Sequence, residues 1–389
     1  LLHGFSSPPA AESGGTYAVA EPFFVDELRW FGFNLLSRAN NHATDYGVEG
    51  LLQTSALLDT AGLLYAGVGR NLALARAPAY LDTAAGRVAL IAASSTFANA
   101  GRAGAQRPDL LGRPGLNPLR HRTVYQVDAE GIAALRRLNA RLGLGEIQRQ
   151  RELFTAPRPD DPGTLLFLEQ RFAESAAFGI ASSVHEGDLS ENLRWIGEAR
   201  RQADWVFVSL HSHEFESHKE QPPAFASQFA HASIDAGADL FLGHGPHLLR
   251  GIELYKGKPV LHGLGNFVFD NELIRFEPAE LYEQHKLGPE SVPADVYDAR
   301  TGLGSRGFPA DPLYWESVLV TIRFEDRDIA EIQLDPIELG HGFPRTRRGR
   351  PALTMEDDGR RILERLRNLS EPFGTRIDIQ RGRGSVQIG

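Results

Sequence analysis

The sequence predicts an α/β fold in which strands and helices alternate. Short apolar runs of strand length are followed by segments whose apolar residues recur at helical spacing, and this order repeats along most of the chain. The composition, with 42% hydrophobic and 23% charged residues, is typical of a chain that buries a full core. The length of 389 residues allows one large domain or two. We expect a single domain spanning residues 1–389.

The composition also argues against several classes of protein. The net charge of −9 gives no support to nucleic-acid binding, and no apolar run is long enough to span a membrane. The chain contains no Cys, which excludes a disulfide framework and a thiolate metal site. Any bound metal is therefore expected on His, Asn, Asp or Glu side chains.

The predicted elements follow one another along the chain. A loop over residues 6–22 precedes a helix (24–31), a strand (31–36), a helix (48–59) and strands at 63–66 and 87–93. Further on we predict helical structure within 128–154, a strand near 164–167, a helix at 190–202, strands at 206–210, 239–242 and 258–262, an antiparallel pair at 315–324 and 329–334, and a helix at 355–369. Ser190 is the predicted N-cap of its helix.

Two long segments, residues 97–155 and 270–313, interrupt this alternation, and residues 340–389 form a C-terminal extension. Loops of such length in a compact domain are commonly functional. Residues 97–125 of the first segment and residues 270–313 both start close to the ends of predicted strands, so we expect these two stretches to frame the mouth of a site.

The start of the first segment is basic. Residues 97–125 are rich in Arg, Pro and Gly and are predicted to be irregular. One hypothesis is that Arg102, Arg107 or Arg113 faces the site and contacts an anionic substrate. The alternative is an ordinary solvated surface loop.

Polar residues that include His follow three of the predicted strands. They are residues 40–45 (NNHATD), 211–214 (HSHE) and 243–247 (GHGPH). In open α/β sheets, ligands bind at the carboxyl ends of the strands. One buried His is usually an ordinary core residue, whereas five at three strand ends predict a shared metal.

The first of these clusters carries its own chemistry. Asn supplies a neutral oxygen ligand, and His42 is either a ligand or a proton donor. Asp45 is three residues away and is placed to orient the His42 imidazole through its other ring nitrogen. The alternative is an ordinary strand-to-helix turn, because Asn, Asp and Gly are common in turns for steric reasons.

Several longer stretches resemble one known family. They are residues 39–51 (ANNHATDYGVEGL), 61–69 (AGLLYAGVG), 237–260 (GADLFLGHGPHLLRGIELYKGKPV) and 264–267 (LGNF). Together they identify the sequence as similar to the poly-γ-glutamate capsule-biosynthesis (CapA-type) family. The resemblance extends in order over roughly residues 22–335.

That family is similar to calcineurin-like metallophosphoesterases. The resemblance therefore implies a two-sheet sandwich flanked by helices, in four α/β/β/α layers, with two divalent metal ions held at strand ends. It implies metal ligands at Asn41, His211, His244 and His247. It also implies that His42 is the catalytic acid near the leaving group and that Asp45 orients it. The ligand types suit Mn, Fe or Zn equally.

The sequence departs from the family pattern in three places. The Gly-Asp and Asn-Leu-Glu motifs that follow the first two strands of the family are absent, so we expect the N-terminal strand and these acidic motifs to precede Leu1. Ser212-His213 stands where the family commonly has Trp-Gly, and Gly245 stands where it often has His.

These features support a metal-dependent hydrolase of the phosphoesterase type. Its substrate would be an anionic small molecule or polymer in capsule, poly-γ-glutamate or cell-envelope metabolism. The alternatives are a non-catalytic component of a poly-γ-glutamate synthesis or export complex and a metal-dependent amide or peptide hydrolase, which fold alone does not separate. The resemblance also implies a cell-surface or extracytoplasmic location, although the sequence shows no signal or anchor pattern.

Overall fold

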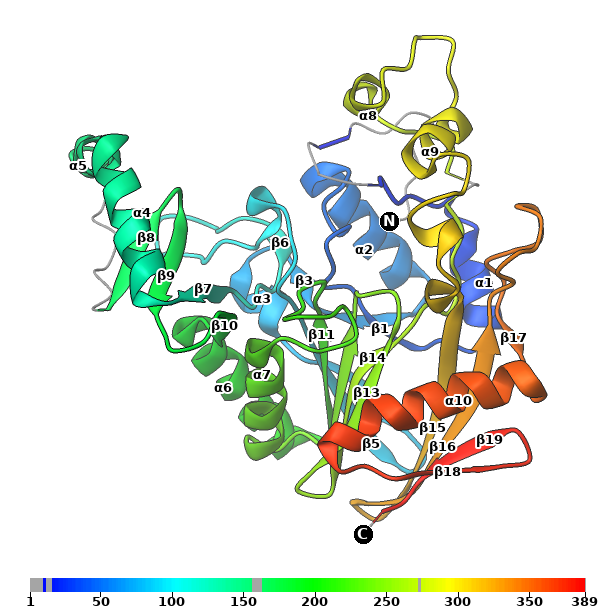
Figure 1. Ribbon diagram of the computed structural model, residues 1–389. Coiled ribbons are helices and arrows are strands. Elements are labelled where there is room, and N and C mark those ends of the chain that lie inside the picture. The colour runs from blue at the N-terminus through cyan, green and yellow to red at the C-terminus, as the bar shows by residue number, and fades with distance from the viewer. Residues whose placement is uncertain (1–9, 12–15, 156–162, 272–273, 389) are drawn as a thin grey trace.

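The computed structural model describes residues 10–11, 16–155, 163–271 and 274–388 (Figure 1). It confirms the mixed α/β class, with one six-stranded and one five-stranded sheet as the main elements. None of the helices in the described ranges is both long and apolar enough to cross a membrane. Residues 6–9 and 12–15 of the predicted N-terminal loop lie outside the described part of the chain.

The six-stranded sheet carries the strand ends that the sequence singled out. Its order is β13–β14–β12–β11–β5–β4, and the four central strands run parallel. The strands are β4 (Ala79–Thr83), β5 (Gly86–Ser94), β11 (Trp205–His211), β12 (Leu240–His244), β13 (Leu249–Tyr255) and β14 (Lys258–Leu264). The predicted strands at 87–93, 206–210, 239–242 and 258–262 are confirmed, whereas β13 was not predicted.

The five-stranded sheet contains the predicted antiparallel pair. It is formed by β15 (Glu316–Glu325), β16 (Asp328–Glu338), β17 (Ala352–Leu353), β18 (Ile377–Gln380) and β19 (Arg383–Val386). The first two strands pair antiparallel over most of their length, with a register shift after Arg323. The predicted antiparallel pair is confirmed, with a turn at residues 326–327 between the strands.

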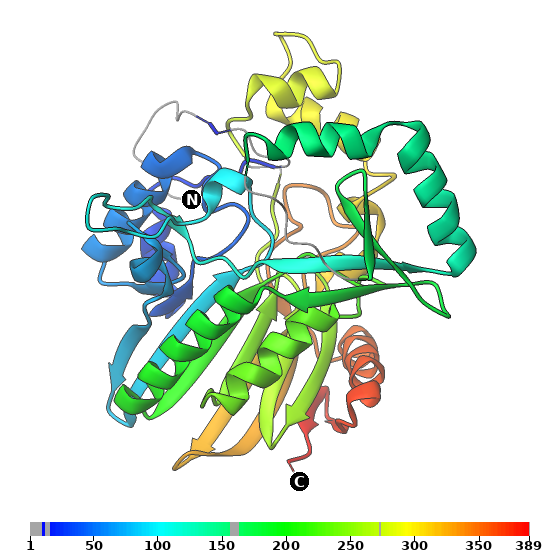
Figure 2. The same cartoon turned by 90° about the vertical axis from the view of Figure 1, so that its left-hand side faces the viewer.

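Alternation along β11 gives the sheet its two faces. Val206, Val208 and Leu210 pack with helices α6 (Glu186–Gln202) and α7 (Ala224–Asp235), which lie side by side over one face (green in Figure 2). Phe207 instead packs toward a core shared by the five-stranded sheet and helix α10 (Asp357–Ser370). Because side chains alternate along a strand, the His211 side chain belongs to this second face.

The N-terminal elements lie beside this sheet. Helix α1 (Phe24–Trp30), strand β1 (Leu35–Ser37), helix α2 (Gly47–Thr60) and strand β2 (Leu64–Ala66) match the predicted order. The predicted strand at 31–36 is too long at its start. Gly32, at φ +86°, takes part in a turn that delays the strand to Leu35.

The first long segment is more regular than predicted. It contains the short 3₁₀ turn η1 (Asn99–Gly101) and strand β6 (Gly115–Leu116). Strand β6 pairs with the earlier strand β3 (Val68–Gly69), beside helix α3 (Leu72–Arg76). A four-stranded sheet follows, made of β7 (His121–Val127), β8 (Thr164–Phe167), β9 (Gln170–Glu174) and β10 (Gly179–Val184). The predicted helix within 128–154 is two helices, α4 (Ala129–Arg141) and α5 (Leu144–Glu152), because Gly143 between them adopts φ +67°.

Two other sequence predictions need correction or completion. Ser190 is not an N-cap, because α6 begins at Glu186 and His185 Nδ1 accepts the Asp188 N–H at 3.2 Å. The second long segment contains helices α8 (Ala279–Gln284) and α9 (Pro293–Thr301), which stand at the top of Figure 1. The 3₁₀ turns η2 (Phe308–Ala310) and η3 (Pro312–Trp315) follow these helices, and η4 (Glu371–Phe373) follows α10 near the C-terminus.

Ser370 fastens α10 to the edge of the six-stranded sheet, and its removal should be measurable. Its fully buried hydroxyl donates to the Leu366 carbonyl at 2.7 Å and accepts the Ile252 N–H at 3.0 Å. Ser370→Ala leaves that strand N–H unsatisfied, so the free energy of unfolding should fall by about 1–3 kcal/mol. Denaturant unfolding checks this, with the exposed Ser385→Ala as the control; equal stabilities of the two variants would contradict it.

Candidate functional site

Register brings the predicted site residues together. β11 and β12 run parallel with His211 opposite His244, so both histidines stand at the same edge of the sheet. Ser37, the last residue of β1, lies 3.0 Å from Ser209 of β11 through the two hydroxyls. The loop that follows β1 therefore delivers Asn41 and His42 to the same edge.

A continuous series of polar contacts links the residues from the three strand ends. His211 Nδ1 lies 3.0 Å from His244 Nδ1, and His211 Nε2 lies 2.9 Å from Asn41 Oδ1. The amide nitrogen of Asn41 is 3.3 Å from His42 Nε2, and His42 Nδ1 is 2.7 Å from Asp45 Oδ2. Five of the six predicted site residues thus form one connected group.

Asp45 is held firmly in this group. Its side chain is 1% exposed, and Oδ2 also accepts the Ala18 N–H at 3.0 Å. The His42 ring is 29% exposed, so one edge of the imidazole is anchored while part of the ring still reaches solvent. An imidazole fixed in this way presents Nε2 as the nitrogen that exchanges a proton.

His247, the sixth predicted residue, reaches the group through another histidine. Its ring centroid is 5.3 Å from that of His213, and its Nδ1 is 2.8 Å from Asn266 Oδ1. The His247 backbone has φ +63°, which is uncommon for a residue other than Gly. Phe308, from the second long segment, lies 5.1 Å away between ring centroids.

Two further residues of the site, His213 and Glu214, belong to the predicted HSHE cluster but were not among the six residues that were given individual roles. His213 Nε2 is 3.0 Å from His211 Nε2, and the Glu214 carboxylate accepts hydrogen bonds from three hydroxyls. The signal that would have found them is the HSHE run, because alternate residues past a strand end return to the same side. Asn266 was likewise visible only as part of the LGNF motif.

Burial favours the neutral form of His211, His213 and His244. Loss of hydration lowers the pKa of His213 and of His244 to about 4 in each case, with the neighbouring His247 adding to the effect. The pKa of His211 falls well below its ordinary value for the same reason, followed by the effects of His244 and His213. Neutral imidazoles are the form that binds metal ions.

These shifts predict how stability depends on pH in the metal-free protein. A buried imidazole whose folded pKa lies below 6.5 takes up its proton more readily in the unfolded chain. The contribution of such an imidazole to the free energy of unfolding is complete above pH 6.5 and is lost as the pH falls toward about 4. We expect His244 to account for on the order of 1–3 kcal/mol of that loss.

Unfolding by denaturant at pH 7.5 and 5, in the presence of a chelator, measures this effect. The loss of stability between the two pH values should be smaller in His244→Gln than in the unsubstituted protein. The exposed His218→Gln is the control and should behave like the unsubstituted protein. A pH dependence that His244→Gln leaves unchanged would rule out this origin.

The donor set suits a cation only in part. No group of three or more His, Asp or Glu side chains within the described ranges is arranged to hold a metal ion. The closest set is His211 Nε2, His213 Nε2 and Asn41 Oδ1, two imidazoles and an amide oxygen. Such N and O donors suit Mn, Fe or Zn. The nearby carboxylates are engaged, since Asp45 holds His42 and Glu214 holds hydroxyls.

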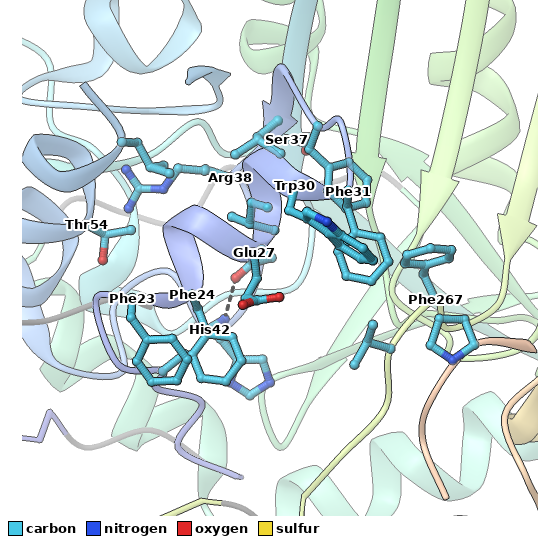
Figure 3. Close-up of a pocket in the computed structure, with 18 of the residues that line it drawn as sticks. Phe23, Phe24, Glu27, Trp30, Phe31, Ser37, Arg38, His42, Thr54 and Phe267 are labelled. Atoms are coloured by element: carbon cyan, nitrogen blue, oxygen red, sulfur yellow. Dashed lines mark hydrogen bonds between the residues drawn. The ribbon is translucent and has the colours of Figure 1, made fainter. Parts of the chain in front are cut away.

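A cavity of about 920 Å³ opens beside His42. Figure 3 shows the aromatic side chains of Trp30, Phe31 and Phe267 gathered in its lining, with adjacent ring centroids 5.1 and 5.9 Å apart. Trp30 is 78% exposed, and the lining also includes Glu27. The cavity offers an apolar surface next to the polar group.

The basic loop takes no part in this lining among the described residues. Arg107 forms an exposed ion pair with Asp109, and the Arg113 side chain donates to the Arg102 carbonyl. The hypothesis that one of these arginines faces the site is not supported, and the solvated-loop alternative describes Arg107 and Arg113. Gly101 of the same segment does lie against Thr44, whose hydroxyl would be 2.6 Å from a Cβ at that position.

Comparison with known proteins decides the family. The bacterial capsule synthesis protein family PGA_cap matches residues 7–271. The chain belongs to this family. An uncharacterized protein of Sinorhizobium fredii is 36% identical over 394 residues, covering 100% of this chain and 83% of that protein. The resemblance to the CapA-type family is therefore confirmed.

Two relatives carry functional names. The PGA biosynthesis protein CapA of Bacillus subtilis is 27% identical over 280 residues, which are 71% of this chain and 54% of that protein. A probable polyglutamine synthesis accessory protein of Mycobacterium tuberculosis is 30% identical over 234 residues, which are 60% of this chain and 44% of that protein. The chain therefore spans about half the length of these named PGA_cap relatives.

Proposed function

We propose that this PGA_cap protein is a metal-dependent hydrolase of the phosphoesterase type that acts on an anionic small molecule or polymer of the capsule or cell envelope. The observation that carries the proposal is the single connected group formed by Asn41, His42, Asp45, His211 and His244. The proposal includes the four-layer arrangement of the metallophosphoesterases, for which two packed sheets with outer helices are the support.

The roles follow from the contacts. Asn41, His211 and His247 would hold divalent cations, which when bound withdraw charge from a phosphate ester and lower the pKa of a nearby water. His42 would give a proton to the leaving oxygen through Nε2, because Nδ1 is committed to Asp45. The buried Asp45 carboxylate, which accepts hydrogen bonds from His42 and from the Ala18 N–H, would hold the imidazole in that orientation.

The second candidate is a non-catalytic component of a poly-γ-glutamate synthesis or export complex. It is favoured by the name of the Mycobacterium tuberculosis relative, which is called an accessory protein. The apolar lining of the cavity beside His42 also suits a surface that docks another molecule. A metal-dependent amide or peptide hydrolase acting on the polymer is the third candidate, and it would use the same donors.

Activity assays with defined metal content separate these candidates. The chelator-treated protein would be loaded with Mn²⁺ or Zn²⁺ and tested against p-nitrophenyl phosphate, a phosphodiester and γ-glutamyl peptides. The proposal expects phosphoester hydrolysis that disappears in chelator and returns with metal. Hydrolysis of the γ-glutamyl peptides alone would favour the amide hydrolase, and metal-free inactivity that no metal reverses would favour the accessory role.

A further inference from the structure

We propose that His213 binds a divalent cation together with His211 and Asn41, and that His244 is a positioning residue that orients His211. The inference rests on the proposed function, because it concerns the same cation. It changes the ligand set implied by the family resemblance, in which His244 was a ligand and His213 was not.

The geometry around His211 Nε2 carries the first half of the proposal. His213 Nε2 lies 3.0 Å from this atom and Asn41 Oδ1 lies 2.9 Å from it. Two ligands bound about 2.0–2.2 Å from one cation are about 3–3.5 Å apart. Both separations from His211 Nε2 are therefore those of ligands that share one ion.

The chain holds His213 in this position from both of its neighbours. The His213 N–H donates to Thr96 Oγ1 at 2.9 Å. The next residue, Glu214, accepts hydrogen bonds through Oε2 from Ser95, Thr96 and Ser212 at 2.7–2.9 Å. A side chain that only pointed to solvent would not need its backbone fastened at successive residues.

Gly245 makes room for the segment that carries His213. It adopts φ +117°, and a Cβ at that position would lie 2.9 Å from the backbone nitrogen of Ser212. A larger residue at 245 is excluded both by its backbone conformation and by this contact. The turn between β12 and His247 and the turn after β11 therefore fit closely, with the His213 ring between those of His211 and His247.

The contacts of His244 carry the second half. Its Nε2 lies 2.9 Å from Ser209 Oγ and its Nδ1 lies 3.0 Å from His211 Nδ1. A neutral imidazole has one N–H. When the lone pair of His211 Nε2 faces a cation, its Nδ1–H donates to His244 Nδ1, and His244 Nε2–H donates to Ser209. Both nitrogens of His244 are then occupied within the protein.

Binding of Co²⁺ to the full chain tests both halves. Metal-free protein would be titrated with Co²⁺ by calorimetry and by visible absorption, which reports the number of bound nitrogens. His213→Gln should bind Co²⁺ more than about 100-fold more weakly and with a changed spectrum. His244→Gln should keep the spectrum and lose about 10–100-fold or less in affinity, as is usual for residues that orient a ligand. His218→Ala, an exposed histidine of the same loop, is the control.

The outcomes separate this inference from the proposed function. If the unsubstituted protein binds Co²⁺ and a folded His213→Gln binds it with the same affinity and spectrum, the assignment of His213 is wrong. A spectrum changed by His244→Gln as much as by His213→Gln makes His244 a ligand and overturns the second half. Failure of the unsubstituted protein to bind Co²⁺ overturns the proposed function as well. His213→Asn, checked by circular dichroism, replaces any His213→Gln protein that does not fold.

Discussion

His42→Ala should lower turnover of a phosphoester by about 10²–10⁴-fold, the usual contribution of a general acid, while leaving the metal content nearly unchanged. The physical reason is that the two nitrogens of the His42 ring have different partners. Nδ1 is committed to the buried Asp45 at 2.7 Å, which leaves Nε2, 3.3 Å from the amide nitrogen of Asn41, as the nitrogen that exchanges the proton. Steady-state kinetics with metal analysis of the same samples measures both quantities.

The control for this prediction is His218→Ala, which removes an exposed imidazole from the loop after β11 and should change neither quantity. A second variant, Asp45→Asn, should also lower turnover, because an amide does not stabilise a charged imidazole ring as the Asp45 carboxylate does. Equal loss of metal and of turnover in His42→Ala would instead make His42 a ligand.

His211→Ala should weaken metal binding by more than the about 10–100-fold that is typical for residues outside the ligand set. His211 contacts three residues of the site, His244 through one ring nitrogen and Asn41 and His213 through the other. It is 7% exposed, so water cannot easily take the place of the lost ring. Under the proposed function its removal would delete a ligand, and it would also remove one hydrogen-bond partner from Asn41 and one from His244.

Calorimetric titration with Mn²⁺ or Zn²⁺ measures the effect of His211→Ala, and His211→Gln tests whether an amide restores part of the affinity. Circular dichroism shows whether each variant is folded. Affinity retained within about 10-fold in a folded His211→Ala protein would remove His211 from the ligand set.

The strand ends were predictable because their sequence pattern is local. Residues 206–210 are apolar apart from Ser209 and stand directly ahead of His211, and a buried parallel strand is typically apolar on both faces. Parallel pairing then placed His211 opposite His244 without further information. The contact of His42 with Asp45 was equally local, since it spans three residues of one turn.

The parts that were missed depend on contacts between distant segments. The position of the His213 backbone depends on a hydrogen bond to Thr96, 117 residues earlier. The four-stranded sheet was hidden because β7, β9 and β10 pair across long loops and are only partly buried, which leaves a weak apolar pattern. The N-cap of α6 was misplaced because His185 seldom caps helices, whereas Ser190 has a common capping side chain.

The proposed function depends most directly on a cation bound at the edge of the six-stranded sheet. A crystal of the protein grown with Mn²⁺, measured at a wavelength where Mn²⁺ scatters anomalously, locates that ion without any assumption about the reaction. If His211 and Asn41 are ligands, the anomalous peak should lie about 2.0–2.3 Å from His211 Nε2 and from Asn41 Oδ1. A map from fully occupied, well-diffracting crystals with no peak within reach of His211 would contradict it.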